Sequence, residues 1–263
     1  MYGERLRRLR EESPLIQCLT NYVAMDLSAN ALLAIGASPA MVHAREEAGE
    51  LAGLASAVVL NIGTLSPPWV EAMHDAARVA RSRGRPVVLD PVAAGATRYR
   101  RETSVALLET GVDIVRGNAS EIRALVGGAA AGRGVDATDP VEAALEAAAQ
   151  LAARTGAVVA TTGARDLLTD GKRVVEVRGG HPIMTRVTAI GCALSGLVGA
   201  FAAVTDDHFE ATTAALAAMK ICGRKASFAG GPGSFRTALL DALYALEPEE
   251  LDAPGVVTEL AAP

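Results

Sequence analysis

The stretch VTAIGCALSGLVGAF (residues 187–201) predicts a loop that leads into a buried helix. Its first half is rich in small residues, its second half is an apolar run of helix length, and Gly191 and Cys192 stand at the junction. The first turn of a helix leaves backbone N–H groups without partners and carries partial positive charge, so it can bind phosphate. Taken alone, the stretch favours a plain core helix, because free cysteine is among the most buried residue types. The rest of the chain decides between a phosphate-binding helix start and a plain core helix.

The composition is typical of a soluble globular protein, with 263 residues of which 50% are hydrophobic and 21% charged. The net charge of −5 argues against a nucleic-acid surface. No apolar run reaches the roughly 18 residues that span a bilayer, and residues 1–12 lack the apolar segment of a signal peptide. Cys18, Cys192 and Cys222 form no CxxC pair, which argues against disulfides and a zinc site and predicts a cytoplasmic protein.

Short apolar strands alternate with helices along the chain. We expect strands at 40–43, 57–61, 86–89, 114–115 and 157–160, and helices at 25–35, 67–84, 139–156, 209–226 and 235–246. Asp139 and Glu142 resemble a capping box at the start of the third helix, and Asp170-Gly171 predicts a type I′ turn in a hairpin at 167–177. This alternation predicts one α/β domain over residues 1–263, with a mostly parallel central sheet flanked by helices on both faces.

Polar residues stand just past the C-terminal ends of four predicted strands, at Asn61, Asp90, Asn118 and Thr162. These ends face one edge of a parallel sheet, where ligands bind, so the four residues should line one cleft. The sequence holds no G-x-x-x-x-G-K-[ST], no G-x-G-x-x-G, no H-E-x-x-H and no G-x-S-x-G. What remains is a phosphate-binding helix start late in the chain with acidic residues upstream, and that order suits the other large class of small-molecule kinases.

Segments over nearly the whole chain resemble the hydroxyethylthiazole kinase family. In family order they are CLTNYVAMDLSANALLAIGASPAM (18–41), NIGTL (61–65), VVLDPVAAGA (87–96), RGNASEI (116–122), TTGARDLLTDG (161–171), IGCALSG (190–196), GPGSF (231–235) and LDALYAL (240–246). The resemblance implies a ribokinase-like fold and transfer of the ATP γ-phosphate to the primary alcohol of 4-methyl-5-(2-hydroxyethyl)thiazole in thiamine salvage. It also implies a homotrimer with its active sites between subunits.

The resemblance further implies a role for each nucleotide-side residue. Arg116, Thr162 and Asn118 match nucleotide-binding positions, and a guanidinium fork suits phosphate oxygens. Asp90 and Glu121 match acidic positions that organise Mg²⁺, partly through water because Mg²⁺ dehydrates reluctantly. The residues alone leave a second interpretation open for Glu121, as an acidic first-turn residue favoured by the helix dipole.

The thiazole pocket is the second set of positions that the resemblance assigns. A flat, sulfur-containing ring needs apolar walls and one or two polar groups. The matching residues are Asn21, Val23, Met41 and Ala189, together with Gly63 and Thr64, which the resemblance places near a neighbouring subunit's thiazole.

Cys192 and Gly191 match the catalytic positions of the family, and Cys192 stands where most ribokinase-like enzymes have an aspartate base. Phosphoryl transfer needs mainly alignment and charge stabilisation, so we expect the thiol to position the hydroxyl rather than act as a strong base. Many family members have Gly-Thr-Gly-Cys where this chain has Ala189-Ile190-Gly191-Cys192. We expect a negative φ at Ala189, so that its methyl narrows the pocket without straining the loop.

Two alternatives stay open. One is a ribokinase-like kinase of another small heterocyclic alcohol, such as a hydroxymethylpyrimidine, and Cys192 in place of aspartate counts against it. The other is a non-catalytic nucleotide-binding sensor, for which Ala189 and Ile190 would be the evidence. A sensor need not keep an acidic pair, so the presence of Asp90 and Glu121 counts against the sensor.

Overall fold

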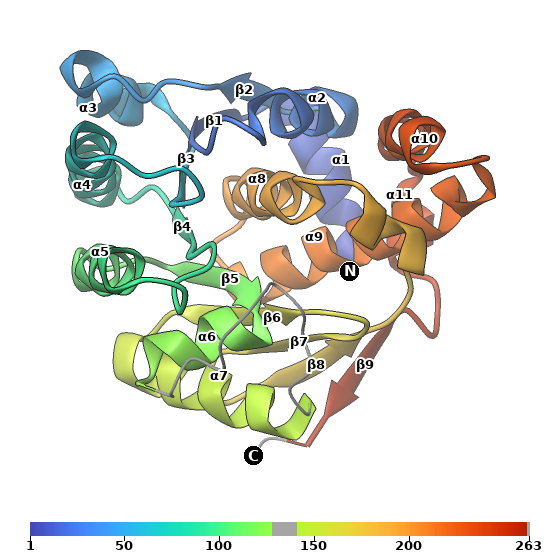
Figure 1. Cartoon of the computed structure of the whole chain (residues 1–263). Coiled ribbons are helices and arrows are strands. Elements are labelled where there is room, and N and C mark those ends of the chain that lie inside the picture. Colours follow the sequence, from blue (N-terminus) through green and yellow to red (C-terminus); the bar gives the residue numbers. More distant parts are fainter. Residues whose placement is uncertain (128–140, 262–263) are drawn as a thin grey trace.

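A nine-stranded sheet with the order β2-β1-β3-β4-β5-β6-β7-β8-β9 runs through the computed structural model, which describes residues 1–127 and 141–261 (Figure 1). The strands are β1 (Leu15–Leu19), β2 (Ser38–Ala40), β3 (Ala57–Asn61), β4 (Val87–Asp90), β5 (Ile114–Asn118), β6 (Val158–Thr162), β7 (Asp166–Thr169), β8 (Val174–Val177) and β9 (Val257–Leu260). Strands β1 to β6 pair in parallel, and β7, β8 and β9 extend the sheet antiparallel. The predicted mostly parallel sheet is therefore confirmed.

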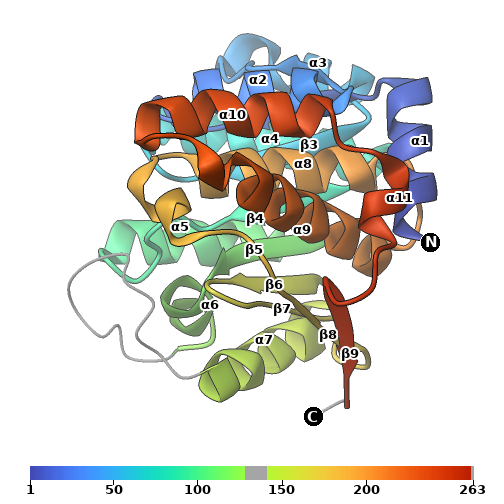
Figure 2. The same ribbon diagram turned by 90° about the vertical axis from the view of Figure 1, so that its right-hand side faces the viewer.

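Helices cover both faces of this sheet (Figures 1 and 2). One face carries α1 (Tyr2–Glu12), α2 (Met25–Ile35), α8 (Ile190–Ala202), α9 (His208–Lys225), α10 (Pro232–Tyr244) and α11 (Pro248–Leu251). The other carries α3 (Arg45–Leu54), α4 (Pro67–Ser82), α5 (Arg98–Glu109), α6 (Ala119–Leu125) and α7 (Val141–Thr155). Neighbouring strand residues alternate between the two cores, as Val58 and Val59 do, because successive side chains of a strand point to opposite faces.

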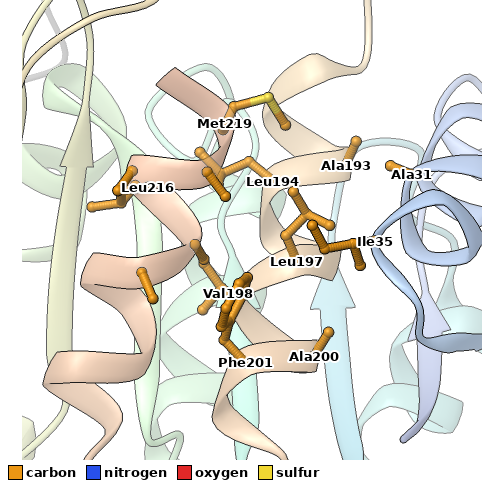
Figure 3. Close-up of a cluster of buried hydrophobic side chains, with 14 of the residues drawn as sticks. Ala31, Ile35, Ala193, Leu194, Leu197, Val198, Ala200, Phe201, Leu216 and Met219 are labelled. Atoms are coloured by element: carbon orange, nitrogen blue, oxygen red, sulfur yellow. The ribbon is translucent and has the colours of Figure 1, made fainter. Parts of the chain in front are cut away.

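Helix α8 lies at the centre of the core between the sheet and the helices α1, α2, α9, α10 and α11, as its apolar sequence predicts. Figure 3 shows Leu197 and Phe201 of α8 among side chains from α2 and α9. Gly199 brings α8 close to the sheet, since a Cβ at this position would lie 2.8 Å from Cγ2 of Val59. Burial of these side chains holds the helix in place and fixes where its N-terminus opens at the sheet edge.

Two predicted elements coincide with the observed ones, and the predicted hairpin has a different turn. The helix at 25–35 is α2, and the strand at 57–61 is β3. Strands β7 and β8 form the hairpin, but the Thr169–Val174 pair leaves a four-residue loop. Gly171 has φ 86°, whereas Asp170 is not among the residues with positive φ, and a type I′ turn needs positive φ at both. Asp170 Oδ1 instead accepts the backbone N–H groups of Lys172 and Arg173.

Other elements were missed or misplaced. The sequence prediction lacks α1, β1, α3, α5, α11 and β9, and its strand at 40–43 lies at Ser38–Ala40. Strand β1 escaped detection because a glutamine stands at its centre. Gln17 is fully buried there and donates to the carbonyls of Val42 (3.2 Å) and Ala48 (3.0 Å). The predicted capping box at 139–142 lies outside the described residues. Within residues 1–127 and 141–261, every helix is too short or too polar to cross a bilayer.

Candidate active site

The four strand-end residues meet at one edge of the sheet, as predicted. Asn61 pairs in register with Asp90 across β3 and β4, and Asn118 pairs with Thr162 across β5 and β6. Helix α8 begins at the same edge, because a Cβ on Gly191 would lie 2.9 Å from Nη2 of Arg116 on β5. The glycine-led helix start and the polar strand ends therefore form one site.

Asp90 is the buried centre of this site. Its Oδ2 accepts three hydrogen bonds, from Nδ2 of Asn61 (2.7 Å), Nη2 of Arg116 (2.8 Å) and Oγ of Ser195 (2.8 Å). Its Oδ1 is buried without a hydrogen-bond partner. A buried carboxylate oxygen without a partner is costly, so this atom points to a ligand that brings positive charge.

Arg116 holds a permanent positive charge beside Asp90. Its Nε donates to Ser195 (3.0 Å) and its Nη1 to Thr162 Oγ1 (3.3 Å). Burial alone would lower the pKa of Arg116, but the charges of Asp90 and Glu121 raise it above its usual value. The guanidinium lies against Gly191, so a Cβ at this point of the helix start would require the hydrogen-bonded Arg116 side chain to shift. Phosphate would meet both the helix terminus and this cation here.

Glu121 has the structural role that its sequence left open, and it also lies close to Asp90. Its Oε2 accepts the N–H of Asn118 (2.8 Å), and Asn118 Oδ1 accepts the N–H of Glu121 (2.9 Å), which forms a capping box. Its Oε1 accepts the N–H of Ala93 (2.8 Å), whose φ of 54° is left-handed. Burial and Asp90 raise the pKa of Glu121, while Arg116 and these N–H groups lower it.

Cys192 lies half-buried in the first turn of α8, where Nδ2 of Asn21 donates to its sulfur (3.3 Å). Burial and the charge of Asp90 raise the pKa of the thiol to about 11, although Arg116 and neighbouring amides lower it. The thiol is thus protonated at neutral pH. Because only the thiolate is a good proton acceptor, this geometry suits a residue that positions the hydroxyl.

Residues predicted for the thiazole pocket are brought together in part. A Cβ on Gly63 would lie 2.6 Å from Nδ2 of Asn21, and Thr64 Oγ1 accepts the N–H of Tyr22 (3.1 Å). These contacts join the loop after β3 to the loop that precedes α2. Met41 packs against the core around α8, and Val23 is 60% exposed.

Comparison with known proteins decides the family. A model of the hydroxyethylthiazole kinase family matches residues 6–249. The chain belongs to the hydroxyethylthiazole kinase family. Hydroxyethylthiazole kinase of Cereibacter sphaeroides is 56% identical over 95% of each chain. That of Rhizobium etli is 57% identical over 96% of this chain and 99% of its own. The resemblance inferred from the sequence motifs is confirmed.

Solved structures agree. Hydroxyethylthiazole kinase from Pyrococcus horikoshii OT3 superposes with a TM-score of 0.91 at 43% identity, over 98% of each chain. A ribokinase-like superfamily protein from Enterococcus faecalis has a TM-score of 0.62 at 12% identity, over 93% of this chain and 89% of that chain. At that identity the likeness shows the fold alone. The predicted ribokinase-like fold is confirmed.

Two residues at this edge of the sheet were not predicted from the sequence. Ser195 is fully buried and bridges Asp90 and Arg116, and the sequence signal that could have indicated it is a lone serine within an apolar run. Arg100 of α5 donates to the carbonyls of Ile62 (2.9 Å), Val92 (2.9 Å) and Gly63 (2.7 Å), and so ties the loops after β3 and β4 together. Its sequence surroundings gave no signal, because surface arginines on helices are common.

The expected negative φ at Ala189 is wrong. Ala189 is the N-cap of α8 with φ 67° and ψ 2°, which is the left-handed region. Its carbonyl already accepts the first helical N–H, from Ala193 (2.9 Å), so the chain reverses into α8 at this residue. The glycine found here in many hydroxyethylthiazole kinases would adopt this conformation without strain.

Ala189→Gly should therefore raise the free energy of unfolding by up to about 1 kcal/mol. Relief of left-handed strain outweighs the extra freedom that glycine gains in the unfolded chain. Urea unfolding of this variant and of Ala193→Gly provides the measurement, and Ala193→Gly, inside the right-handed helix, should lose stability. Equal losses in both variants would contradict the strain at Ala189.

Proposed function

We propose that the chain transfers the γ-phosphate of ATP to the primary alcohol of 4-methyl-5-(2-hydroxyethyl)thiazole in thiamine salvage. The observation that carries this is the buried Asp90–Arg116 pair, whose unpartnered Asp90 oxygen lies at the edge where Gly191 and Cys192 open α8. A cation-binding oxygen, a phosphate-binding helix start and a hydroxyl-binding thiol are the parts that alcohol phosphorylation needs. Relatives named hydroxyethylthiazole kinase support this choice of alcohol.

On the nucleotide side, Arg116 and the N–H groups of α8 from Gly191 onward would bind the phosphates, and Thr162 and Asn118 would contact the nucleotide beside them. Thr162 Oγ1 accepts from Arg116 and donates to the carbonyl of Gly117 (3.3 Å), so it orients the guanidinium. Fixed charge and fixed N–H groups lower the barrier without covalent chemistry, because they stabilise charge that moves between phosphate oxygens.

Mg²⁺ would be held at Asp90 Oδ1, which the structure leaves without a partner. Glu121 would act mainly through its charge and through water, since each of its oxygens already accepts a backbone N–H. Within the described part of the chain, no group of three or more His, Cys, Asp or Glu could hold a metal. A site with few carboxylates suits Mg²⁺, which keeps water and takes phosphate oxygens as further ligands. The ion would neutralise phosphate charge.

On the alcohol side, Cys192 and Asn21 would hold the hydroxyl, and Met41, Val23 and Ala189 would line the thiazole ring. The high pKa of Cys192 keeps its proton on sulfur, so the thiol orients the hydroxyl without taking its proton. A hydroxymethylpyrimidine kinase is disfavoured by this thiol. A sensor is disfavoured by the presence of both Asp90 and Glu121, since a protein that only binds a nucleotide need not keep an acidic pair.

An ADP-release assay on a panel of thiazole and pyrimidine alcohols tests this function. We expect Mg²⁺-dependent ADP formation that requires the thiazole alcohol, and a loss on the order of 10² in kcat for Glu121→Gln. Glu102→Gln, which alters an exposed ion pair with Arg98, should change nothing. A faster reaction with a pyrimidine alcohol would show that the pyrimidine alcohol, not the thiazole alcohol, is the substrate. ATP binding without any turnover would favour the sensor.

We further propose a homotrimer with shared sites, in which Gly63 and Thr64 complete a neighbour's pocket. Tyr22 and Val23 beside Thr64 are 66% and 60% exposed, which supports coverage by another subunit. A single kinase domain over residues 1–263 is supported by the single sheet, and a cytoplasmic location by the three free cysteines.

Light scattering should therefore give three subunits. Cys192→Ala and Thr64→Arg variants, each inactive alone, should regain activity when co-expressed, because mixed trimers contain intact sites. Wild-type activity in a monomer would contradict the shared site.

A further inference from the structure

Asn61 is buried, and the direction of its amide is determined by two neighbours. Its Oδ1 accepts the backbone N–H of Gly63 (3.0 Å), a group that can only donate. Its Nδ2 therefore faces Asp90 Oδ2 (2.7 Å), a charged atom that can only accept. A flipped amide would set oxygen against oxygen and N–H against N–H. The charge of Asp90 and the turn at Gly63 thus fix the same orientation.

Asn21 lies between Asn61 and the thiol, and its amide nitrogen donates to both. Its Oδ1 accepts the backbone N–H of Ala24 (3.1 Å), so its Nδ2 points to Asn61 Oδ1 (2.8 Å) and to Cys192 Sγ (3.3 Å). The sulfur receives an N–H and keeps its own hydrogen free for another acceptor. Gly63 packs against Asn21 too closely for a Cβ, which confines the amide.

We propose that Asn61 is a positioning residue, which passes the polarity of Asp90 through Asn21 to Cys192 and so leaves the S–H hydrogen for the oxygen of the bound alcohol. The chain of hydrogen bonds exists in the free protein, and only the identity of the acceptor rests on the proposed function. The carboxylate of Asp90, on the nucleotide side, therefore determines that the Cys192 thiol on the alcohol side acts as a hydrogen-bond donor to the alcohol.

The S–H stretching band of Cys192 reports this orientation without any substrate. An infrared difference between the wild type and Cys192→Ala isolates the band from those of Cys18 and Cys222. Asn61→Leu should shift or broaden it, because Asn21 then loses the acceptor that aims its N–H at sulfur. Asn30→Leu removes a comparable Asn–Asp contact on the surface of α2 (3.0 Å to Asp26) and should leave the band unchanged.

Kinetics give the second measurement. Asn61→Leu should lower kcat about tenfold, the effect of one hydrogen bond, with KM for ATP changed less. If Asn61→Leu fails to fold, Asn61→Ala removes the same acceptor for Asn21 and the same N–H toward Asp90 with a smaller side chain, and tests the same point. An unshifted band in either folded variant would overturn the proposal. A shifted band beside a wild type inactive on the thiazole alcohol would refute the proposed function and leave Asn61 as the positioning residue of Cys192.

Discussion

Arg116→Met is expected to lower kcat/KM for ATP by about 10²–10³ and to lower the free energy of unfolding by about 3–5 kcal/mol. Arg116 is 6% exposed and supplies hydrogen bonds to Asp90, Ser195 and Thr162. Methionine fills similar space but leaves the carboxylate of Asp90 buried without its counter-charge. Steady-state kinetics at varied ATP and urea unfolding measure the two effects.

Two further variants separate the effects on stability and catalysis. Asp90→Asn/Arg116→Met should recover much of the stability and none of the activity, because a neutral amide needs no counter-charge. Arg98→Met, which breaks an exposed ion pair with Glu102, should change stability by less than about 1 kcal/mol. Wild-type KM for ATP and wild-type stability in Arg116→Met would refute the role of Arg116.

Lys220→Met is expected to lower the free energy of unfolding by about 3–5 kcal/mol, since it breaks a second buried ion pair. Lys220 Nζ lies 2.9 Å from Asp166 Oδ1 and donates to the carbonyl of Gly163 (2.7 Å). Asp166 in turn accepts the N–H of Gly163 (2.9 Å). The pair holds the turn that follows Thr162, so its loss should also weaken nucleotide binding.

The loss of stability in Lys220→Met should depend on pH. Burial raises the pKa of Asp166 in the folded chain, and the charge of Lys220 reduces this rise without cancelling it. Between the pKa of Asp166 in the unfolded chain and its higher pKa in the folded chain, the folded chain therefore binds more protons. The free energy of unfolding therefore falls as pH rises through that window, and the window widens without Lys220. The deficit of Lys220→Met should be larger near about pH 8 than near about pH 5. Asp166→Asn/Lys220→Met should cost less than Lys220→Met alone, and an equal cost would contradict the ion pair.

The sheet and its polar edge were predictable from sequence for a physical reason. Buried parallel strands need continuous apolar runs, so Asn61, Asp90 and Thr162 stand out where each run stops. The converging geometry then follows from strand direction alone. The roles given to Met41 and Val23 came from family resemblance. The structure shows where these two residues lie, but no contact of theirs indicates what they bind.

What escaped prediction depends on contacts between distant segments. The left-handed φ of Ala189 is set by the reversal into α8, and no local residue demands it. From the sequence alone, Ser195 looks like an ordinary residue of an apolar helix, and only the fold shows that it lies beside Asp90. Gln17 breaks the apolar pattern of β1, yet its buried amide finds backbone partners on another segment. Hydrogen-bond partners of this kind are a property of the folded chain.

The Arg100 clamp has an entropic consequence. One guanidinium from α5 binds three carbonyls on two loops, so the loops after β3 and β4 lose their conformational freedom together when the chain folds. Ordering a loop residue costs about 1–2 kcal/mol of free energy. Because that loss occurs on folding, a ligand at this edge meets loops that are already ordered, and more of its contact energy remains as affinity.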